Sequence, residues 1–264
     1  MKTKTALVTG ASGGIGLEIA RNLAQKKIDL VIVARGEKRL REIAQELEST
    51  YDITVVPLSY DLLKDSSAND IFEDLELRGI AIDMLVNNAG CVEYGAFAEV
   101  SEEDVTRMLL LNNQALVRMV HRFLPGFIEN DFGRILNVSS ITGFQPTPFI
   151  AIYGATKAFV LSFTEALSIE LQGTGVKVTA LCPGVTDTGM IQSVNQEHSD
   201  KISIPKFITG DPKNVAKSGV NASFSGKVIE VPGIGNKMAV NAAQIPPKWI
   251  YRKVSSLLTK IIMK

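Results

Sequence analysis

The amino-acid sequence predicts an α/β fold in which one doubly wound parallel sheet of about seven strands is covered by helices on both faces. Seven short apolar runs alternate with longer segments of helical periodicity, which is the pattern of successive β-α-β units. The runs are almost continuously apolar, as strands are when helices cover both faces of a parallel sheet. The chain has 264 residues, 45% of them hydrophobic and 21% charged, so we expect one large domain.

The expected elements follow one another along the whole chain. The strands are residues 5–9, 30–34, 54–57, 84–87, 134–139, 177–182 and 227–231, and the helices are residues 16–26, 38–49, 68–78, 105–129 and 153–171. A further short helix is expected after Asp211, because Asp is a good N-cap and Pro212 then occupies the first helical position. Residues 189–210 lack clear periodicity, which leaves open a mobile substrate-covering loop or an ordinary surface loop.

Charge and cysteine content exclude several classes of protein. Lys plus Arg and Asp plus Glu both number 28, so no net field attracts a polyanion, and nucleic acid is not expected as the main partner. Cys91 and Cys182 lie in apolar stretches outside any metal-binding pattern; we expect both to be reduced and buried, which favours a cytoplasmic protein. Neither a signal peptide nor a membrane-spanning stretch is expected.

The C-terminal residues 246–264 are expected to be a tail rather than a separate domain. Residues 248–264 combine one apolar helical stripe with five basic and no acidic side chains. A basic amphipathic helix of this kind can dock on its own domain, on a second subunit or on an anionic membrane surface. Docking on protein is the commoner fate, and peripheral membrane contact stays open.

A glycine-rich turn follows the first expected strand. The sequence TGASGGIG places Gly10, Gly14 and Gly16 between that strand and a helix. Glycine permits the tight turn and lets bare backbone approach a pyrophosphate at the positive end of the helix. Glycines also make ordinary bends, but the strand-turn-helix context favours a Rossmann-type dinucleotide site over residues 1–245. The residues expected to contact the cofactor here are Gly10, Ser12, Gly13, Gly14, Ile15 and Gly16.

Arg35 indicates which dinucleotide the chain prefers. It ends the second expected strand, where an acidic residue would bind the ribose of NAD(H). Since a guanidinium can pair with a 2′-phosphate that a carboxylate would repel, NADP(H) is preferred over NAD(H). The alternative is an ordinary solvated arginine. Asp61, after the third strand, is a candidate for hydrogen bonding the adenine, although acidic residues are common at strand ends.

Tyr153 and Lys157 stand one helical turn apart in the sequence YGATK. Residues four apart lie on the same face of a helix, so this spacing puts an ammonium close to a phenol. Tyrosine ordinarily has a pKa of about 10, and a neighbouring cation favours its phenolate. The pair can therefore act as an acid or base, although the same spacing also arises by chance on many helices.

Five motifs, taken together, make the chain resemble the short-chain dehydrogenase/reductase family over nearly its whole length. They are TGASGGIG, NNAG ending at Gly90, NVSSITG, YGATK and PGVTDT beginning at Pro183. The resemblance matches Ser140 to the catalytic serine, since Ser139 would point to the opposite side of an extended chain. Asn112 matches the family's helix asparagine better than Asn113 does.

The resemblance implies a catalytic set of Asn112, Ser140, Tyr153 and Lys157. Tyr153 would donate a proton to a carbonyl oxygen while hydride arrives from the nicotinamide, and Ser140 would hydrogen-bond the same oxygen. Lys157 would bind the nicotinamide ribose and lower the pKa of Tyr153, and Asn112 would hold a water that connects Lys157 to solvent. No metal is needed. The implied cofactor contacts also include Asn88, Ala89, Gly90, Pro183, Gly184, Val185 and Thr188, whereas His121 and His198 match no catalytic position.

Several properties stay open at this point. Apolar residues in the segment 190–207 favour a small to medium lipophilic carbonyl or alcohol substrate, although they could equally form the loop's own core. The resemblance implies a homodimer through the helices 105–129 and 153–171, or a higher homo-oligomer; VIEVPGIGNK matches the family's ending only loosely, which speaks against a tetramer. The alternative functions are a catalytically silent NADP(H)-binding scaffold or regulator and a nucleotide-sugar epimerase or dehydratase, which would need a larger C-terminal domain.

Overall fold

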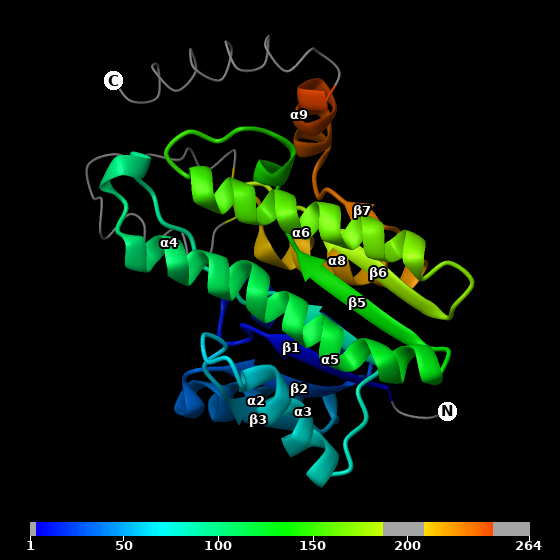
Figure 1. The fold of residues 1–264 in the computed structure, drawn as a ribbon. Coiled ribbons are helices and arrows are strands. Elements are labelled where there is room, and N and C mark those ends of the chain that lie inside the picture. The colour runs from blue at the N-terminus through cyan, green and yellow to red at the C-terminus, as the bar shows by residue number, and fades with distance from the viewer. Residues whose placement is uncertain (1–3, 187–208, 245–264) are drawn as a thin grey trace.

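A seven-stranded parallel sheet forms the centre of the protein in a computed structural model that describes residues 4–186 and 209–244 (Figure 1). The strand order is β3-β2-β1-β4-β5-β6-β7, so the chain crosses over between β3 and β4 and then extends the sheet in the other direction. The strands are β1 (Thr5–Thr9), β2 (Asp29–Ala34), β3 (Val55–Ser59), β4 (Met84–Asn87), β5 (Gly133–Val138), β6 (Val176–Leu181) and β7 (Ile229–Glu230). The predicted doubly wound sheet is confirmed.

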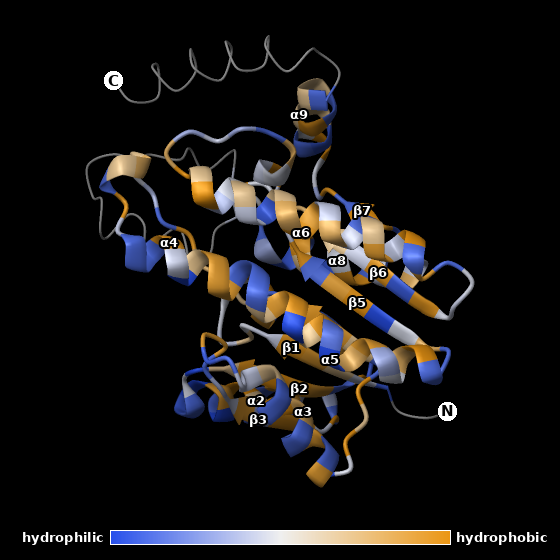
Figure 2. Cartoon of the chain, viewed as in Figure 1, coloured by the Kyte–Doolittle hydropathy of each residue, from blue (hydrophilic) through white to orange (hydrophobic). Residues whose placement is uncertain are grey.

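Helices cover both faces of this sheet. One face packs against α1 (Gly14–Gln25), α2 (Glu37–Tyr51) and α8 (Pro212–Ser225), and the other against α3 (Ser67–Leu77), α5 (Ala115–Glu129) and α6 (Ala151–Glu170). Alternate residues of one strand enter the two cores: Ala6 and Val8 pack on the first face and Leu7 on the second. Figure 2 shows mostly hydrophobic strands between helices that carry both kinds of residue. Burial on both faces explains why the strands are almost continuously apolar.

The expected strands are all present, with ends shifted by at most two residues; the shortest is β7. The helix expected after Asp211 is also present, and the Asp211 carboxylate accepts a hydrogen bond from the backbone N–H of Lys213 at 2.9 Å. One helix, α9 (Ile234–Gln244), was not expected. Its glycines and asparagines are weak helix formers, so its sequence carries little helical signal.

The helix expected at residues 105–129 is interrupted. It begins earlier as α4 (Glu102–Leu109), where the Ser101 hydroxyl accepts a hydrogen bond from the N–H of Asp104 at 3.1 Å. It then passes through a π-helical turn, η2 (Leu110–Gln114), before continuing as α5. π-Turns are rare and often occur at functional sites.

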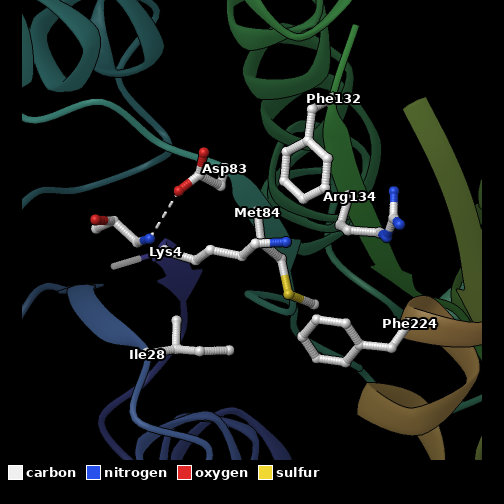
Figure 3. A pocket seen from close by; sticks show the side chains of 8 residues that line it. Lys4, Ile28, Asp83, Met84, Phe132, Arg134 and Phe224 are labelled. Carbon is white, nitrogen blue, oxygen red and sulfur yellow. Dashed lines mark hydrogen bonds between the residues drawn. The ribbon is translucent and has the colours of Figure 1, made fainter. Parts of the chain in front are cut away.

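Parts of the sequence predictions lie outside the described residues, namely the segment 189–208 and the C-terminal helix expected at 248–264. Within residues 4–186 and 209–244, no helix is long and apolar enough to cross a membrane. A cavity of about 10 Å³ lies between Lys4, Met84, Phe132 and Phe224, at the amino ends of β1, β4 and β5 (Figure 3). It is about the size of one water molecule and lies at the edge of the sheet opposite to the glycine-rich turn.

Candidate active site

The glycine-rich turn forms a bare backbone cradle at the carboxyl end of β1. Gly10 and Gly14 have φ angles of +66° and +55°, which glycine adopts without the strain that a side chain adds. A Cβ atom at Gly16 would lie 2.3 Å from Asn88 Nδ2 and 2.4 Å from the Gly10 carbonyl oxygen, so only glycine fits there. The α1 N-terminus follows directly, with Gly13 as N-cap and no acidic residue in its first turn, which leaves its N–H groups suited to an anion.

Thr9 fastens this cradle to the end of β4. Its hydroxyl donates to the Val86 carbonyl at 3.1 Å and accepts from the N–H groups of Asn88 and Ala89 at 3.0 and 3.2 Å. In return, the Asn88 side chain donates to the carbonyls of Thr9 and Gly10 at 3.0 and 3.2 Å. Sequence reasoning missed this role of Thr9. The hydrogen bonds bring the expected contacts Asn88 and Ala89 to the glycine turn.

The first asparagine of NNAG has a different position, inside the sheet. Asn87 donates to the Asn137 side chain at 2.9 Å, and Asn137 donates to the Thr164 hydroxyl at 3.0 Å. All three side chains are buried, so the chain of hydrogen bonds joins β4, β5 and α6 within the core. Asn87 therefore stabilises the strands that carry the site.

Arg35 directly follows β2, the strand whose end is hydrogen-bonded to the cradle. The N–H groups of Gly10 and Ala11 donate to the Val33 carbonyl at 2.8 and 3.3 Å, which ties the cradle to the end of β2. Arg35, two residues further on, is exposed, and its guanidinium forms no ion pair with any residue in 4–186 or 209–244. Asp61 is half-buried after β3, where one carboxylate oxygen accepts from the N–H of Leu63 at 3.1 Å.

Tyr153 and Lys157 lie on the first turns of α6. The Lys157 ammonium is 5.6 Å from the centre of the Tyr153 ring and donates to the Val138 carbonyl at 2.9 Å. Lys157 is buried and forms no ion pair with the part of the chain that the structure describes, and desolvation lowers its pKa to about 8. Burial likewise raises the pKa of Tyr153 to about 12, although part of the Tyr153 surface remains accessible.

Ser140 is the serine that faces the tyrosine. A hydrogen bond with the Ser140 hydroxyl partly offsets the effect of burial and lowers the pKa of Tyr153. Lys157 was expected to lower it, but in the chain alone the Lys157 ammonium is not among the groups that do so. The neighbouring Ser139 instead donates to the main-chain carbonyl of Lys157 at 2.7 Å, which agrees with the opposite orientation predicted for consecutive residues.

Asn112 sits in the π-turn and holds the segment after β4. Its side-chain amide donates to the Cys91 carbonyl at 2.9 Å and accepts from the Cys91 N–H at 2.8 Å. A Cβ atom at Gly90 would lie 3.0 Å from Asn112 Oδ1 and 3.6 Å from Lys157 Nζ, which puts both side chains next to the same glycine. The Ala115 N–H bonds the Leu110 carbonyl five residues back, and such a turn leaves one carbonyl without a helical donor.

Thr156 is a further residue that sequence reasoning missed. Its buried hydroxyl accepts from Asn112 Nδ2 at 3.1 Å and donates to the Tyr153 carbonyl at 2.7 Å. The next residue of the π-turn, Asn113, donates to the Thr156 carbonyl at 2.9 Å. Thr156 therefore connects the π-turn to the first turn of α6. One sequence feature could have indicated this role: a threonine within a helix often donates a hydrogen bond to the carbonyl three or four residues back.

The two cysteines differ from each other. Both have free thiols, and Cys182 is buried as expected, but Cys91 is only half-buried. The prediction for Cys91 was wrong because it lies in an irregular segment at the carboxyl edge rather than in the core. Its thiol is close enough to influence the pKa values of Tyr153 and Lys157.

The segment after β6 completes the site. The Pro183 carbonyl accepts hydrogen bonds from the Ile141 N–H at 2.9 Å and the Ser140 hydroxyl at 3.4 Å. A Cβ atom at Gly184 would lie 2.6 Å from the Asn236 side chain of α9, so this segment passes closely under α9. The Val185 carbonyl accepts from the N–H of Gly210 at 2.7 Å. Thr188 and His198 lie outside the described residues, and His121 is exposed on α5.

The structure thus brings together residues from six segments at the carboxyl edge of the sheet: the cradle after β1, the segment after β4, the π-turn, the segment after β5, the start of α6 and the segment after β6. Hydrogen bonds connect Asn112 to Cys91 and Thr156, and Thr156 to the Tyr153 carbonyl, while the Lys157 ammonium lies 5.6 Å from the centre of the Tyr153 ring. The Ser140 hydroxyl donates a hydrogen bond to the Pro183 carbonyl. Gly90 lies next to Asn112 and Lys157 and is two residues after Asn88, which bonds the cradle, so the two parts of the site are neighbours in the chain. A ligand that spans the cradle and the tyrosine would lie across the point where the strand order reverses, where α/β sheets commonly bind dinucleotides.

Comparison with known proteins agrees with this arrangement. A family model described as short chain dehydrogenase matches residues 4–199. An oxidoreductase of Staphylococcus epidermidis is 36% identical over 195 residues, which cover 74% of this chain and 83% of the relative. A short-chain dehydrogenase from Sphingobium yanoikuyae solved with NADPH superimposes with a TM-score of 0.79 at 31% identity, covering 91% of this chain and 93% of that one. A variant of actinorhodin polyketide ketoreductase with NADPH gives a TM-score of 0.80 at 32% identity, with 89% and 98% covered.

Proposed function

The chain belongs to the short-chain dehydrogenase family of oxidoreductases, and on that premise we propose that it transfers a hydride between NADP(H) and a carbonyl or secondary alcohol carbon. The substrate class that we propose is a small to medium lipophilic compound, with Tyr153 as general acid or base. The observation that supports this most strongly is the buried Lys157 ammonium 5.6 Å from the centre of the Tyr153 ring, with the buried Ser140 close enough to lower the pKa of Tyr153.

The protonation state of Tyr153 suits carbonyl reduction. Because the pKa of Tyr153 is raised to about 12, the phenol keeps its proton at neutral pH and can donate it to a carbonyl oxygen. Ser140 would donate a second hydrogen bond to that oxygen and so stabilise the negative charge that develops on it. In the direction of alcohol oxidation, Tyr153 would have to lose its proton first, which becomes easier as the pH rises.

Lys157 would return a proton to Tyr153 after each turnover, while Asn112 holds the neighbouring π-turn in place. With a pKa lowered to about 8, Lys157 can gain and lose a proton near neutral pH. The Asn112 side chain is fully engaged by Cys91 and Thr156, so it fixes the π-turn rather than moving a proton itself. We propose that a water held near this turn connects Lys157 to solvent.

The residues present fit NADP(H). The bare backbone at Gly10 and Gly16 leaves room for a pyrophosphate to approach the α1 N-terminus. Arg35 is an exposed cation without an ion pair among the described residues, which suits a 2′-phosphate. Lys157 would hold the ribose hydroxyls next to the nicotinamide, and Asp61 keeps one carboxylate oxygen available for the adenine. When bound, the cofactor supplies or accepts the hydride.

The remaining cofactor contacts are proposed from their positions. Ser12, Gly13, Gly14 and Ile15 belong to the cradle, Asn88, Ala89 and Gly90 line its β4 side, and Pro183, Gly184, Val185 and Thr188 would face the nicotinamide. We further propose that residues 1–245 act as one catalytic unit and that the chain forms a homodimer through α5 and α6. Exposed apolar side chains at Ile128, Phe159 and Ile169 support that interface.

A cofactor assay tests the proposed function. Wild-type protein is mixed with NADPH and a panel of ketones, and the loss of NADPH absorbance is compared with that of Tyr153→Phe. We expect turnover by the wild type and almost none by the variant; equal rates would refute the role of Tyr153. Tight NADPH binding without turnover across the panel would favour a non-catalytic binding protein.

The cofactor preference needs its own variant. Arg35→Asp is expected to weaken NADPH binding and to improve NADH binding, because the carboxylate repels a 2′-phosphate and can bond a free ribose hydroxyl. Unchanged NADPH affinity in Arg35→Asp would show that another group holds the phosphate.

A further inference from the structure

Two loops at the rim of the candidate site meet through their aromatic side chains. Tyr94 lies in the loop after β4, and Phe149 lies in the loop after β5, just before α6 begins. Their ring centres are 5.9 Å apart with an angle of 27° between the planes, which is a stacked arrangement. The Gly95 N–H donates to the Phe149 carbonyl at 2.8 Å, so backbone and side chains join the two loops together.

Phe149 is held in an unfavourable backbone conformation. Its φ angle is +66°, a region that glycine adopts readily and that a bulky side chain rarely occupies. Strain of this kind persists only where the surrounding contacts impose it, and it is concentrated at functional sites. Here the contacts are the stack on Tyr94 and the hydrogen bond from Gly95.

Both loops contact residues next to the proposed proton donor or in its catalytic set. On the Phe149 side, the Thr147 hydroxyl packs so closely on the residue after Tyr153 that a Cβ atom at Gly154 would be 2.2 Å from it. On the Tyr94 side, the main chain of Cys91 is held by Asn112, and the Cys91 thiol influences the pKa of Tyr153. The two loops that carry the aromatic pair are therefore both connected to residues of the candidate site.

Glu93 of the Tyr94 loop is paired with a cation of the following α-helix. Glu93 forms an ion pair with Arg107 of α4, and Arg107 also contacts Asp104 at 2.9 Å. A substrate carboxylate or phosphate would have to compete with these acids for the Arg107 guanidinium. The apolar surface of the two loops includes the stacked rings of Tyr94 and Phe149, both half-buried.

We propose that Tyr94 and Phe149 form an aromatic wall of the substrate site that selects uncharged carbonyl compounds with a planar ring next to the reacting group. This inference rests on the proposed function. A ring offers a flat apolar face to the pair, whereas a flexible chain loses more conformational freedom for the same contact. The strained Phe149 conformation fixes the ring that the substrate would meet.

The test compares two ketones in wild type and variants. An aryl methyl ketone and a linear methyl ketone with the same number of carbons are reduced with NADPH, and the ratio of their kcat/KM values is determined. Tyr94→Leu and Phe149→Gly each remove one ring, and the second also removes the strained φ. We expect the aryl-over-linear ratio to fall by roughly three- to tenfold in each variant, as loss of one aromatic contact implies.

Phe97→Leu is the matched control. Phe97 belongs to the same loop as Tyr94 but is 61% exposed, so its variant should keep the wild-type ratio. A purely structural role for the pair would lower kcat/KM for both ketones equally and lower the Tm, with an unchanged ratio, and would overturn the inference while the proposed function stands. Failure of the wild-type protein to reduce any ketone would overturn the proposed function and the inference with it.

Discussion

Lys157 is expected to destabilise the protein in the absence of cofactor. The residue is 5% exposed, its ammonium donates one hydrogen bond to the Val138 carbonyl, and no carboxylate of residues 4–186 or 209–244 forms an ion pair with it. Burial lowers the pKa of Lys157 from 10.5 to about 8, so the folded state holds this proton less tightly than the unfolded state does. The substitution Lys157→Met removes the charge, keeps most of the volume and loses the hydrogen bond.

The free-energy cost of burying Lys157, and its dependence on pH, follow from these two pKa values. Below pH 8 the lysine is charged in both states, and folding pays a desolvation cost of about 3 kcal/mol. Between pH 8 and 10.5 the unfolded state binds more protons, so the unfolding free energy rises with pH and the cost at pH 9.5 is about 1 kcal/mol. The lost hydrogen bond offsets about 1 to 2 kcal/mol at either pH. Lys157→Met should therefore be about 1 to 2 kcal/mol more stable than wild type at pH 7, and this advantage should shrink by about 2 kcal/mol at pH 9.5.

Urea unfolding of both proteins without cofactor, at pH 7 and pH 9.5, measures this difference. Lys217→Met, at an exposed position on α8, is the control and should show no pH-dependent change relative to wild type. The reasoning is refuted if Lys157→Met is less stable than wild type by the same amount at both pH values, because the buried ammonium would then carry no desolvation cost. The expected stabilisation together with loss of activity would show that this lysine is retained for function.

Two further predictions concern residues that position the site. Gly16→Ala places a methyl group against the Asn88 side chain and the Gly10 backbone. It should lower the unfolding free energy by about 1 to 3 kcal/mol, as measured by urea unfolding. It should also raise the Kd for NADPH at least about tenfold, as measured by fluorescence titration. An Ala variant with wild-type affinity would contradict the tight fit of the cradle. Thr156→Val removes the hydroxyl between Asn112 and the Tyr153 carbonyl, and should cost about 1 to 3 kcal/mol of stability and lower kcat, whereas Thr156→Ser should restore both. Equal kcat values for the Val and Ser variants would argue against a positioning role.

Local sequence chemistry was enough to predict the sheet and the cradle. Strand ends are marked by the change from apolar runs to glycine or polar residues, and the order strand, glycine-rich turn, helix occurs where Gly10 and Gly16 lie. The spacing of Tyr153 and Lys157 and the alternation of Ser139 and Ser140 likewise follow from helix and strand geometry. Each of these predictions depends on residues close together in the chain.

The features that were missed depend on contacts between distant segments. The segment 105–129 has a continuous helical pattern, but the turn at Asn112 is held by side-chain hydrogen bonds to Cys91 and Thr156, which lie 21 and 44 residues away. The direction in which the pKa of Tyr153 shifts could also not be predicted without the structure. A nearby lysine was expected to lower the pKa of Tyr153, but burial has the larger effect and no sequence pattern reports it.

Transfer of a deuterium label tests the central claim that Tyr153 and its neighbours support hydride transfer to a carbonyl carbon. The wild-type protein is incubated with a ketone that it reduces and with NADPH carrying deuterium at the transferable position of the nicotinamide, and the alcohol is analysed by mass spectrometry. We predict one deuterium on the carbinol carbon in the wild-type product and almost no labelled alcohol from Tyr153→Phe. Unlabelled alcohol from the wild type, or undiminished labelled alcohol from the variant, would contradict the account.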